Sequence, residues 1–283
     1  MPGRYATRAH LDGLWFNREL QCRSENSFNS SNFALTMFVY FFLAFGDGRK
    51  SVGEAVKDND DESYRAYVAS QRKKTDFVAG VAAGKQSALQ WTTQEQIEAV
   101  AAILQQRVKL VKGFGLCHGS RSGREAVWFR AAWPGIQAWG TEISPVAAST
   151  APWTMPWDYH HQRPEWIGSA DFVYSNALDH SFNASLAVSR WIEQTHDEGA
   201  VVIHWSDTHY HATTNEVDRF GAKYEDLKRL VCGLQRAPGD LFVEKIMLPK
   251  KHDVPKYAKI AMFALVIMRA GAHHNEGHSI CSA

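Results

Sequence analysis

VKGFGLCHGSRSGREAVWFRAAWPGIQAWGTEISP, residues Val111–Pro145, is the stretch that decides the fold of this chain. A short apolar run ends in the small-residue turn Cys117–Gly123, and an amphipathic segment follows from Arg124 to Trp133. After a Pro-Gly turn, a second apolar run spans Ile136 to Ile143 and carries Glu142 near its end. Strand, glycine turn, helix and strand in this order are typical of the first half of a nucleotide-binding α/β domain.

The turn has the residue types that a phosphate or carboxylate ligand requires. Gly119 and Gly123 lack a Cβ, so the backbone can approach a ligand closely. The helix that follows directs free N–H groups back toward the turn, where they favour an anion. Glu142 lies about 20 residues past the turn, the spacing at which an acidic side chain accepts hydrogen bonds from a ribose.

Composition narrows the class of protein. The chain has 283 residues, 45% of them hydrophobic, and a net charge of +1. This balance gives no electrostatic footprint for nucleic acid, so we expect no nucleic-acid partner. The four cysteines never occur as CxxC, which predicts reduced thiols in an intracellular, cytoplasmic protein and no disulfide framework. They are Cys22, Cys117, Cys232 and Cys281.

Residues 1–90 read as a helical or irregular N-terminal extension. The apolar run from Phe33 to Phe45 is shorter than the roughly 20 residues that a membrane span needs, so we expect a buried helix or an interaction face for a protein partner. Ser63 to Lys74 is weakly patterned and predicts a surface helix without chemistry. The next helix is expected to start with a capping box, either Thr92 with Glu95 or Thr93 with Gln96.

The remaining chain alternates between expected strands and helices. After Glu142 we expect strands at Trp153 to Trp157, Ala170 to Ser175 and Ala200 to Trp205, and helices at Ser181 to Gln194 and Tyr224 to Leu234. Leu241 to Leu248 and Ile260 to Met268 predict a terminal antiparallel pair. The fold expected is therefore α/β and Rossmann-like, a seven-stranded, mostly parallel sheet with a terminal antiparallel strand.

Several ordered motifs carry a resemblance to a known family. They are CHG-x-R-x-G at Cys117–Gly123, GTEIS at Gly140–Ser144, WD-[FY]-H at Trp157–His160, YSN-x-x-DH-[SA] at Tyr174–Ser181 and DRFGA at Asp218–Ala222. From Val111 to Arg269 the chain resembles class I S-adenosylmethionine-dependent methyltransferases, within a subgroup of uncharacterised methyltransferase-domain proteins. The resemblance implies a methyltransferase-like domain over residues 91–270. The polar, His-containing composition of residues 271–283 predicts a mobile tail.

The family implies S-adenosyl-L-methionine as the cofactor and assigns roles by position. Gly119, Ser120 and Gly123 would form the turn under its methionine part, with Arg121 pairing either with the cofactor carboxylate or with Glu125. Glu142 would hold the ribose, and Ile143 would lie against the adenine. Asp158 would reach the adenine amino group, with Trp157 or Tyr159 beside the ring. Ser175 and Asn176 would line the floor beneath the methyl group. The middle glycine of the common G-x-G-x-G turn is replaced here by Arg121.

Methyl transfer to a hydroxyl or amine needs a base but no metal. Asp179 and His180 follow the fourth expected strand and are the first candidates, although either could instead serve the start of the next helix. His204, near the end of the fifth expected strand, and Asp207 and His209, which follow it, are the second candidates. The thirteen histidines lack cysteines or carboxylates at ligand spacing, so we expect surface histidines and no metal site.

Three hypotheses about function remain open at this stage. The first is a methyltransferase acting on the oxygen or nitrogen of a small-molecule or sugar-like acceptor. The second is a catalytically retired accessory subunit that keeps the fold, docked into a larger assembly through its N-terminal region. The third, a dehydrogenase-type nucleotide domain, is disfavoured by the terminal antiparallel strands.

Overall fold

The computed structural model describes residues 62–85, 91–206, 218–237, 239–250, 260–269 and 279–281, with side chains placed in all of these except 79–85. All of them belong to one compact unit, Lys57–Ala283. The predictions for the apolar run from Phe33 to Phe45 lie outside the described residues. No helix in the described ranges combines the length and the apolar character needed to cross a membrane.

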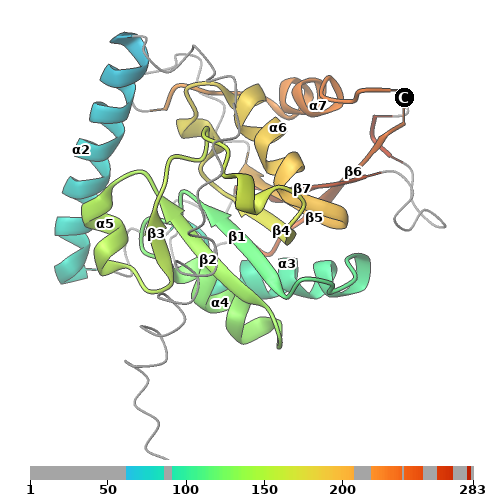
Figure 1. Ribbon diagram of the computed structural model, residues 1–283, viewed down its shortest axis with the longest axis horizontal. Helices are drawn as coiled ribbons and strands as arrows, with labels where there is room; N and C mark the ends of the chain where they lie inside the picture. The colour runs from blue at the N-terminus through green and yellow to red at the C-terminus, as the bar shows by residue number, and fades with distance from the viewer. Residues whose placement is uncertain are drawn as a thin grey trace, which may run out of the picture. The chain divides into compact units, whose positions relative to one another are not determined.

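The core of the fold is a seven-stranded sheet with the order β3-β2-β1-β4-β5-β7-β6 (Figure 1). All neighbouring strands pair in parallel except β7, which runs antiparallel to both β5 and β6. The strands are β1 (Phe114–His118), β2 (Gln137–Glu142), β3 (Thr154–Pro156), β4 (Ala170–Ser175), β5 (Thr195–Ser206), β6 (Leu241–Met247) and β7 (Met262–Arg269). The predicted fold class is confirmed. The antiparallel strand β7 lies inside the sheet, however, and its hairpin partner β6 forms the edge.

Helices cover both faces of the sheet, as expected when parallel strands are joined by crossovers. Figure 1 shows α3 (Gln94–Arg107) and α4 (Arg124–Ala132) on one side and α6 (Ala184–Gln194) with α7 (Tyr224–Cys232) on the other. The shorter elements are α5 (Pro145–Thr150), η3 (Pro164–Trp166) and η4 (Leu178–His180). The first described helix, α2 (Glu62–Lys85), contacts α5.

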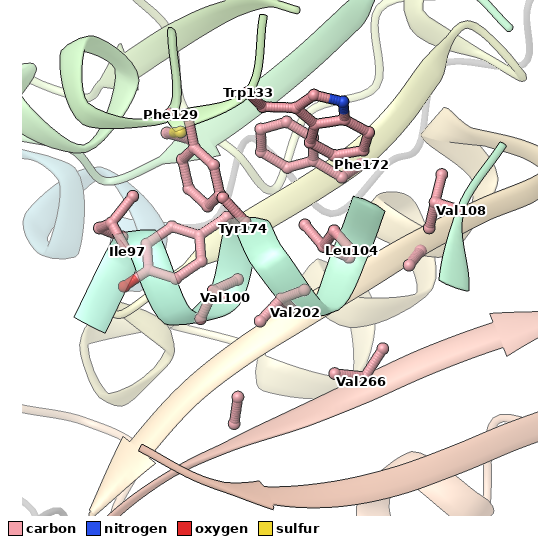
Figure 2. Packing of buried hydrophobic residues seen from close by; sticks show 14 of the residues in the cluster. Ile97, Val100, Leu104, Val108, Phe129, Trp133, Phe172, Tyr174, Val202 and Val266 are labelled. Carbon is pink, nitrogen blue, oxygen red and sulfur yellow. The ribbon is translucent and has the colours of Figure 1, made fainter. Parts of the chain in front are cut away.

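Side-chain alternation along the strands divides the core into two layers. Phe172 and Tyr174 of β4 pack with the α3/α4 layer, whereas Val173 packs with the α6/α7 layer. Every residue of β4 is buried, because helices cover this strand on both sides. In the first layer the Phe172 ring lies 4.5 Å from Phe129 and 5.9 Å from Trp133, measured between ring centroids (Figure 2). This packing fixes the strand ends that carry the candidate site.

Of the two predicted capping boxes, the structure forms Thr93 with Gln96. The Thr93 hydroxyl accepts a hydrogen bond from the backbone N–H of Gln96, and the side-chain oxygen of Gln96 accepts one from the backbone N–H of Thr93. Thr92 is instead buried beside β4, where its hydroxyl lies 3.1 Å from the Tyr174 hydroxyl. The start of α3 is therefore tied to the central strand of the sheet.

The domain boundaries at residues 91 and 270 stay predictions. Helix α2 lies in the same compact unit as the sheet. At the other end, the Ile280 backbone amide donates to the Val243 carbonyl of β6 over 2.9 Å, so residues 279–281 lie against the edge strand of the sheet.

The prediction of four reduced thiols is wrong for one pair. Cys232, at the end of α7, forms a disulfide with Cys281, and their Cα atoms lie 5.4 Å apart. The fold brings the pair together across a sequence separation of 49 residues, which no local spacing motif reveals. Cys117 is free and buried. Cys232 and Cys281 therefore give no support to the intracellular location that we inferred from reduced thiols.

Candidate active site at the carboxyl ends of the strands

The sheet order places the candidate residues at one edge. The chain leaves β1 and β4 toward opposite sides of the sheet, and in such sheets ligands bind at this switch point, outside the carboxyl ends of the strands. The glycine turn follows β1, Glu142 ends β2, Asp158 follows β3, and Ser175 ends β4. The structure thus brings together residues from four separate strand ends.

The turn after β1 is held by the chain's own packing. Gly119 has a φ of +68°, and a Cβ there would lie 2.5 Å from the Cβ of Ala177. Gly123 has a φ of +69°, and a Cβ there would lie 2.6 Å from the Thr154 hydroxyl. Both positions therefore require glycine before any ligand is considered. The turn also holds Arg121 at a φ of 41°, a left-handed conformation that is unusual for a residue other than glycine.

Ser120 has a structural role in the turn. Its amide donates to the Thr141 carbonyl of β2 over 3.0 Å, and the Gly123 amide donates to the Ser120 carbonyl over 2.9 Å. Its hydroxyl lies where a Cβ on Gly140 would be, so the side chain packs against β2. These contacts direct Ser120 toward its neighbouring strand.

Glu142 bridges the turn after β1 and the loop after β2. Oε2 accepts from the Arg121 amide at 3.0 Å, and Oε1 accepts from the Ser144 amide at 3.2 Å. The residue is 4% exposed. Burial raises the pKa of this carboxyl group, while the Ser144 amide and the nearby Arg121 act to lower it. A carboxylate offers about four lone-pair sites, so acceptor capacity remains after these two bonds.

Asp158 is already bonded on both oxygens. Oδ1 accepts from the His160 amide at 3.0 Å and lies 2.8 Å from His160 Nδ1, while Oδ2 accepts from the Tyr64 hydroxyl at 2.7 Å. Burial alone would raise the pKa of Asp158, but the bonds from His160 and Tyr64 outweigh it and lower the pKa. Asp158 is therefore an anion held between the loop after β3 and helix α2.

Tyr159, Ser175 and Asn176 make internal hydrogen bonds. The Tyr159 hydroxyl donates to the Ala177 carbonyl at 3.0 Å, joining the loops after β3 and β4. The Ser175 hydroxyl donates to the His118 carbonyl at 3.1 Å. The Asn176 amide donates to the Thr92 hydroxyl ahead of α3. These three side chains therefore hold the strand ends in register with one another.

A cluster of charged side chains surrounds His180, the candidate base. His180 Nδ1 lies 2.9 Å from Asp218 Oδ1, and its Nε2 lies 3.9 Å from Asp179 Oδ1. Lys74 of α2 places Nζ 3.2 Å from the same Asp218 oxygen. Asp179 and His180 thus stand in one charged cluster with two residues that the sequence reading did not include.

Helix α2 supplies most of what the sequence reading missed. Besides Tyr64 and Lys74, its Arg72 donates to the Ile143 carbonyl at 3.1 Å, and its Asp76 accepts from the Ser144 hydroxyl. The predicted surface helix is therefore present, but its buried face contacts residues of the candidate site. A signal was present in the spacing of Tyr64, Tyr67, Gln71 and Thr75, which are all buried on one face. Because half of that stripe is polar, a count of apolar residues passes over it.

Comparisons with known proteins establish the fold. No protein-family model matches the sequence, and no curated protein matches it. Among solved structures, the plantazolicin methyltransferase BpumL, bound to a pentazolic desmethylPZN analog and SAH, has a TM-score of 0.55 and 10% identity over 73% of this chain and 96% of its own. The complex of the Haloferax volcanii Trm112 methyltransferase activator with a putative methyltransferase has a TM-score of 0.53 and 15% identity over 72% and 100%. This chain therefore has the class I, Rossmann-like methyltransferase fold.

Proposed function

We propose that this protein is an S-adenosylmethionine-dependent methyltransferase acting on a hydroxyl or amine of a small-molecule or sugar-like acceptor. One observation carries the proposal: the Glu142 carboxylate ends β2 and is bridged by a backbone amide to the glycine turn after β1, at the switch point of a sheet with the methyltransferase order. A ribose bound there would find two acceptor oxygens beside the glycine turn.

The residues present fit the cofactor at this end of the site. Glu142 would hold the ribose hydroxyls, Arg121 would face the methionine carboxylate, and Ile143 would lie against the adenine. At Asp158 the cofactor would compete with the Tyr64 hydroxyl on Oδ2 and with His160 on Oδ1. When bound, the cofactor supplies an electrophilic methyl group on a sulfonium. The chain's own residues then align the acceptor and remove its proton.

In this proposal His180 is the base and Asp179 stands beside it. Both follow β4, on the same edge as the glycine turn. The Gly119 turn and the Tyr159, Ser175 and Asn176 side chains keep the strand ends in place. Their internal hydrogen bonds support a positioning contribution rather than direct ligation.

Calorimetry of the full chain with S-adenosylhomocysteine tests the proposal. We expect saturable binding, and we expect Glu142→Gln to weaken it at least tenfold, since the amide offers one acceptor oxygen where the carboxylate offers two. The control is Glu98→Gln on the exposed side of α3, which should bind like the wild type. A wild type that does not bind would favour the catalytically retired accessory subunit. A partner docking through residues 1–90 stays a prediction.

A further inference from the structure

The His180 imidazole is held asymmetrically between two carboxylates. Its Nδ1 is 2.9 Å from Asp218 Oδ1, within hydrogen-bond distance, whereas its Nε2 is 3.9 Å from Asp179 Oδ1, beyond it. The His180 side chain is 23% exposed, so the cluster is not sealed within the protein. Among the described residues, Asp218 is therefore the carboxylate nearer to the ring, and it lies on the Nδ1 side.

Asp218 is held in place by the segment on which it lies. The amide of Phe220 donates to the Asp179 carbonyl over 2.9 Å, which ties this segment to η4. The guanidinium of Arg219 lies over the rings of Tyr67 and Phe182, 5.5 and 5.4 Å from their centroids. The contact between Asp218 and His180 is thus part of a packed arrangement that joins η4, α2 and the chain before α7.

We propose that Asp218 is the positioning residue for His180, holding the imidazole as its Nδ1–H tautomer so that Nε2 presents a lone pair to the acceptor. A carboxylate only accepts hydrogen bonds, so the proton of the neutral ring lies on the nitrogen that faces it. This inference rests on the proposed methyl transfer and assigns a role to the DRFGA motif, which that function had not used.

The step balances in atoms and charge. The acceptor's hydroxyl or amine proton passes to His180 Nε2 as its oxygen or nitrogen bonds to the methyl carbon. The carbon–sulfur bond breaks and its electron pair stays on sulfur. The imidazolium that results lies between Asp218 on Nδ1 and Asp179 near Nε2, and both carboxylates stabilise its charge.

The charges around His180 fit this role. Among the described residues, the charged groups around it are Asp179 of η4, Asp218, and Lys74 of α2 behind Asp218. The hydrogen bond from His180 and the nearby Lys74 keep the pKa of Asp218 well below its ordinary value. Asp218 therefore stays an anion and an acceptor across the neutral pH range.

The same three residues have the composition of a cation site, since their potential ligand atoms all lie within 4.8 Å of one another. Two contacts disfavour that reading. Asp218 Oδ1 already faces the His180 ring, and the Lys74 ammonium lies 3.2 Å from the same oxygen. A divalent cation would have to displace both. The positioning role, by contrast, is consistent with both contacts of Asp218.

Nitrogen NMR of the histidine rings tests the proposal in the full chain without an acceptor. The His180 signals are identified by their loss in His180→Gln. We expect the Nδ1–H tautomer in the wild type and a shift toward the Nε2–H tautomer in Asp218→Ala. Lys74→Met removes the ammonium beside Asp218 Oδ1 and should keep the wild-type tautomer, as should Asp226→Ala, which removes a surface ion pair of α7.

Three results would overturn the proposal: an Nε2–H tautomer in the wild type, an unchanged tautomer in Asp218→Ala, or His180 signals that move on addition of Mg²⁺ alone. The last would indicate a cation site. Binding of S-adenosylhomocysteine, measured on the same samples, reports on the proposed function separately. A protein that binds it but shows the wrong tautomer keeps the methyltransferase proposal and loses only the role of Asp218.

Discussion

The Tyr64 hydroxyl donates a 2.7 Å hydrogen bond to Asp158 Oδ2 across 94 residues of sequence. Burial, reinforced by the Asp158 charge, raises the pKa of Tyr64 far above its ordinary value, so the hydroxyl remains a donor. Asp158 is also the residue proposed to receive the adenine amino group. In the proposed complex, helix α2 and the cofactor would therefore compete for one carboxylate.

We predict that Tyr64→Phe tightens the binding of S-adenosylhomocysteine about tenfold, because a hydrogen bond to a charged group contributes roughly 1.5–3 kcal/mol and no longer has to be exchanged. Calorimetry measures the change. Phe77→Ala is the control, because Phe77 lies on the same helix with its side chain exposed. Weaker binding in Tyr64→Phe would mean instead that α2 helps to hold the ligand.

Local patterns were enough to predict the sheet but not the contacts of α2. The alternation of apolar runs and turns gave the strand at Ala170–Ser175 with its observed bounds. The contact from Tyr64 to Asp158, by contrast, depends on how a distant helix packs on finished strand ends. Half of the buried stripe on this helix is polar, so its spacing marks the buried face only weakly and does not show which strand ends the helix meets.

Some buried carboxylates of the domain could also be placed from the sequence, and others could not. The position of Glu142 followed from strand order and spacing alone, because a strand end has a defined place in a parallel sheet. Asp171 carried no such signal and no role in the sequence reading. It is fully buried at the start of β4, and it accepts from the amides of Val111, Lys112 and Phe114. Asp171 therefore holds the segment that leads into β1 in place.

We predict that Asp171→Ala destabilises the protein by about 3 kcal/mol, because it leaves three backbone donors and the His196 ring without their shared acceptor. Urea unfolding at neutral pH gives the value. Asp240→Ala is the matched control: Asp240 also accepts from backbone amides, at Arg236 and Ala237, but in a surface turn, so its loss should cost about 1 kcal/mol. Equal losses in the two variants would contradict the anchoring role.

We predict that stability falls as the pH falls from 6.5 toward 4, through His118. Its Nε2 faces Gln194 Oε1 and its Nδ1 faces the Thr141 hydroxyl, each at 2.8 Å, so the neutral ring is fully bonded. Burial lowers the pKa of His118 from 6.5 to about 4. The unfolded chain therefore binds more protons in this window, and up to about 3 kcal/mol is lost on acidification.

Urea unfolding at several pH values measures this loss, with His118→Gln as the comparison. The variant is less stable at neutral pH, but the gap should narrow as the pH falls. The raised pKa of Glu142 acts in the opposite direction, because it favours protonation of the native state. Comparing the two curves cancels that contribution. Parallel curves would show that His118 carries none of the pH dependence.

The Cys232–Cys281 disulfide yields the last prediction. It closes a loop of 49 residues that contains β6 and β7, and a loop of this length stabilises a fold by about 4 kcal/mol through the entropy of the unfolded chain. Dithiothreitol should therefore lower the melting temperature of the wild type. The melting temperature of Cys232→Ser should already be at this lower value and should not change on reduction. The Ile280–Val243 backbone bond depends on the same closure, so hydrogen exchange at Ile280 should rise in parallel. If reduction leaves both the melting temperature and this exchange rate unchanged, the tail is held by its packing on β6 and not by the covalent link.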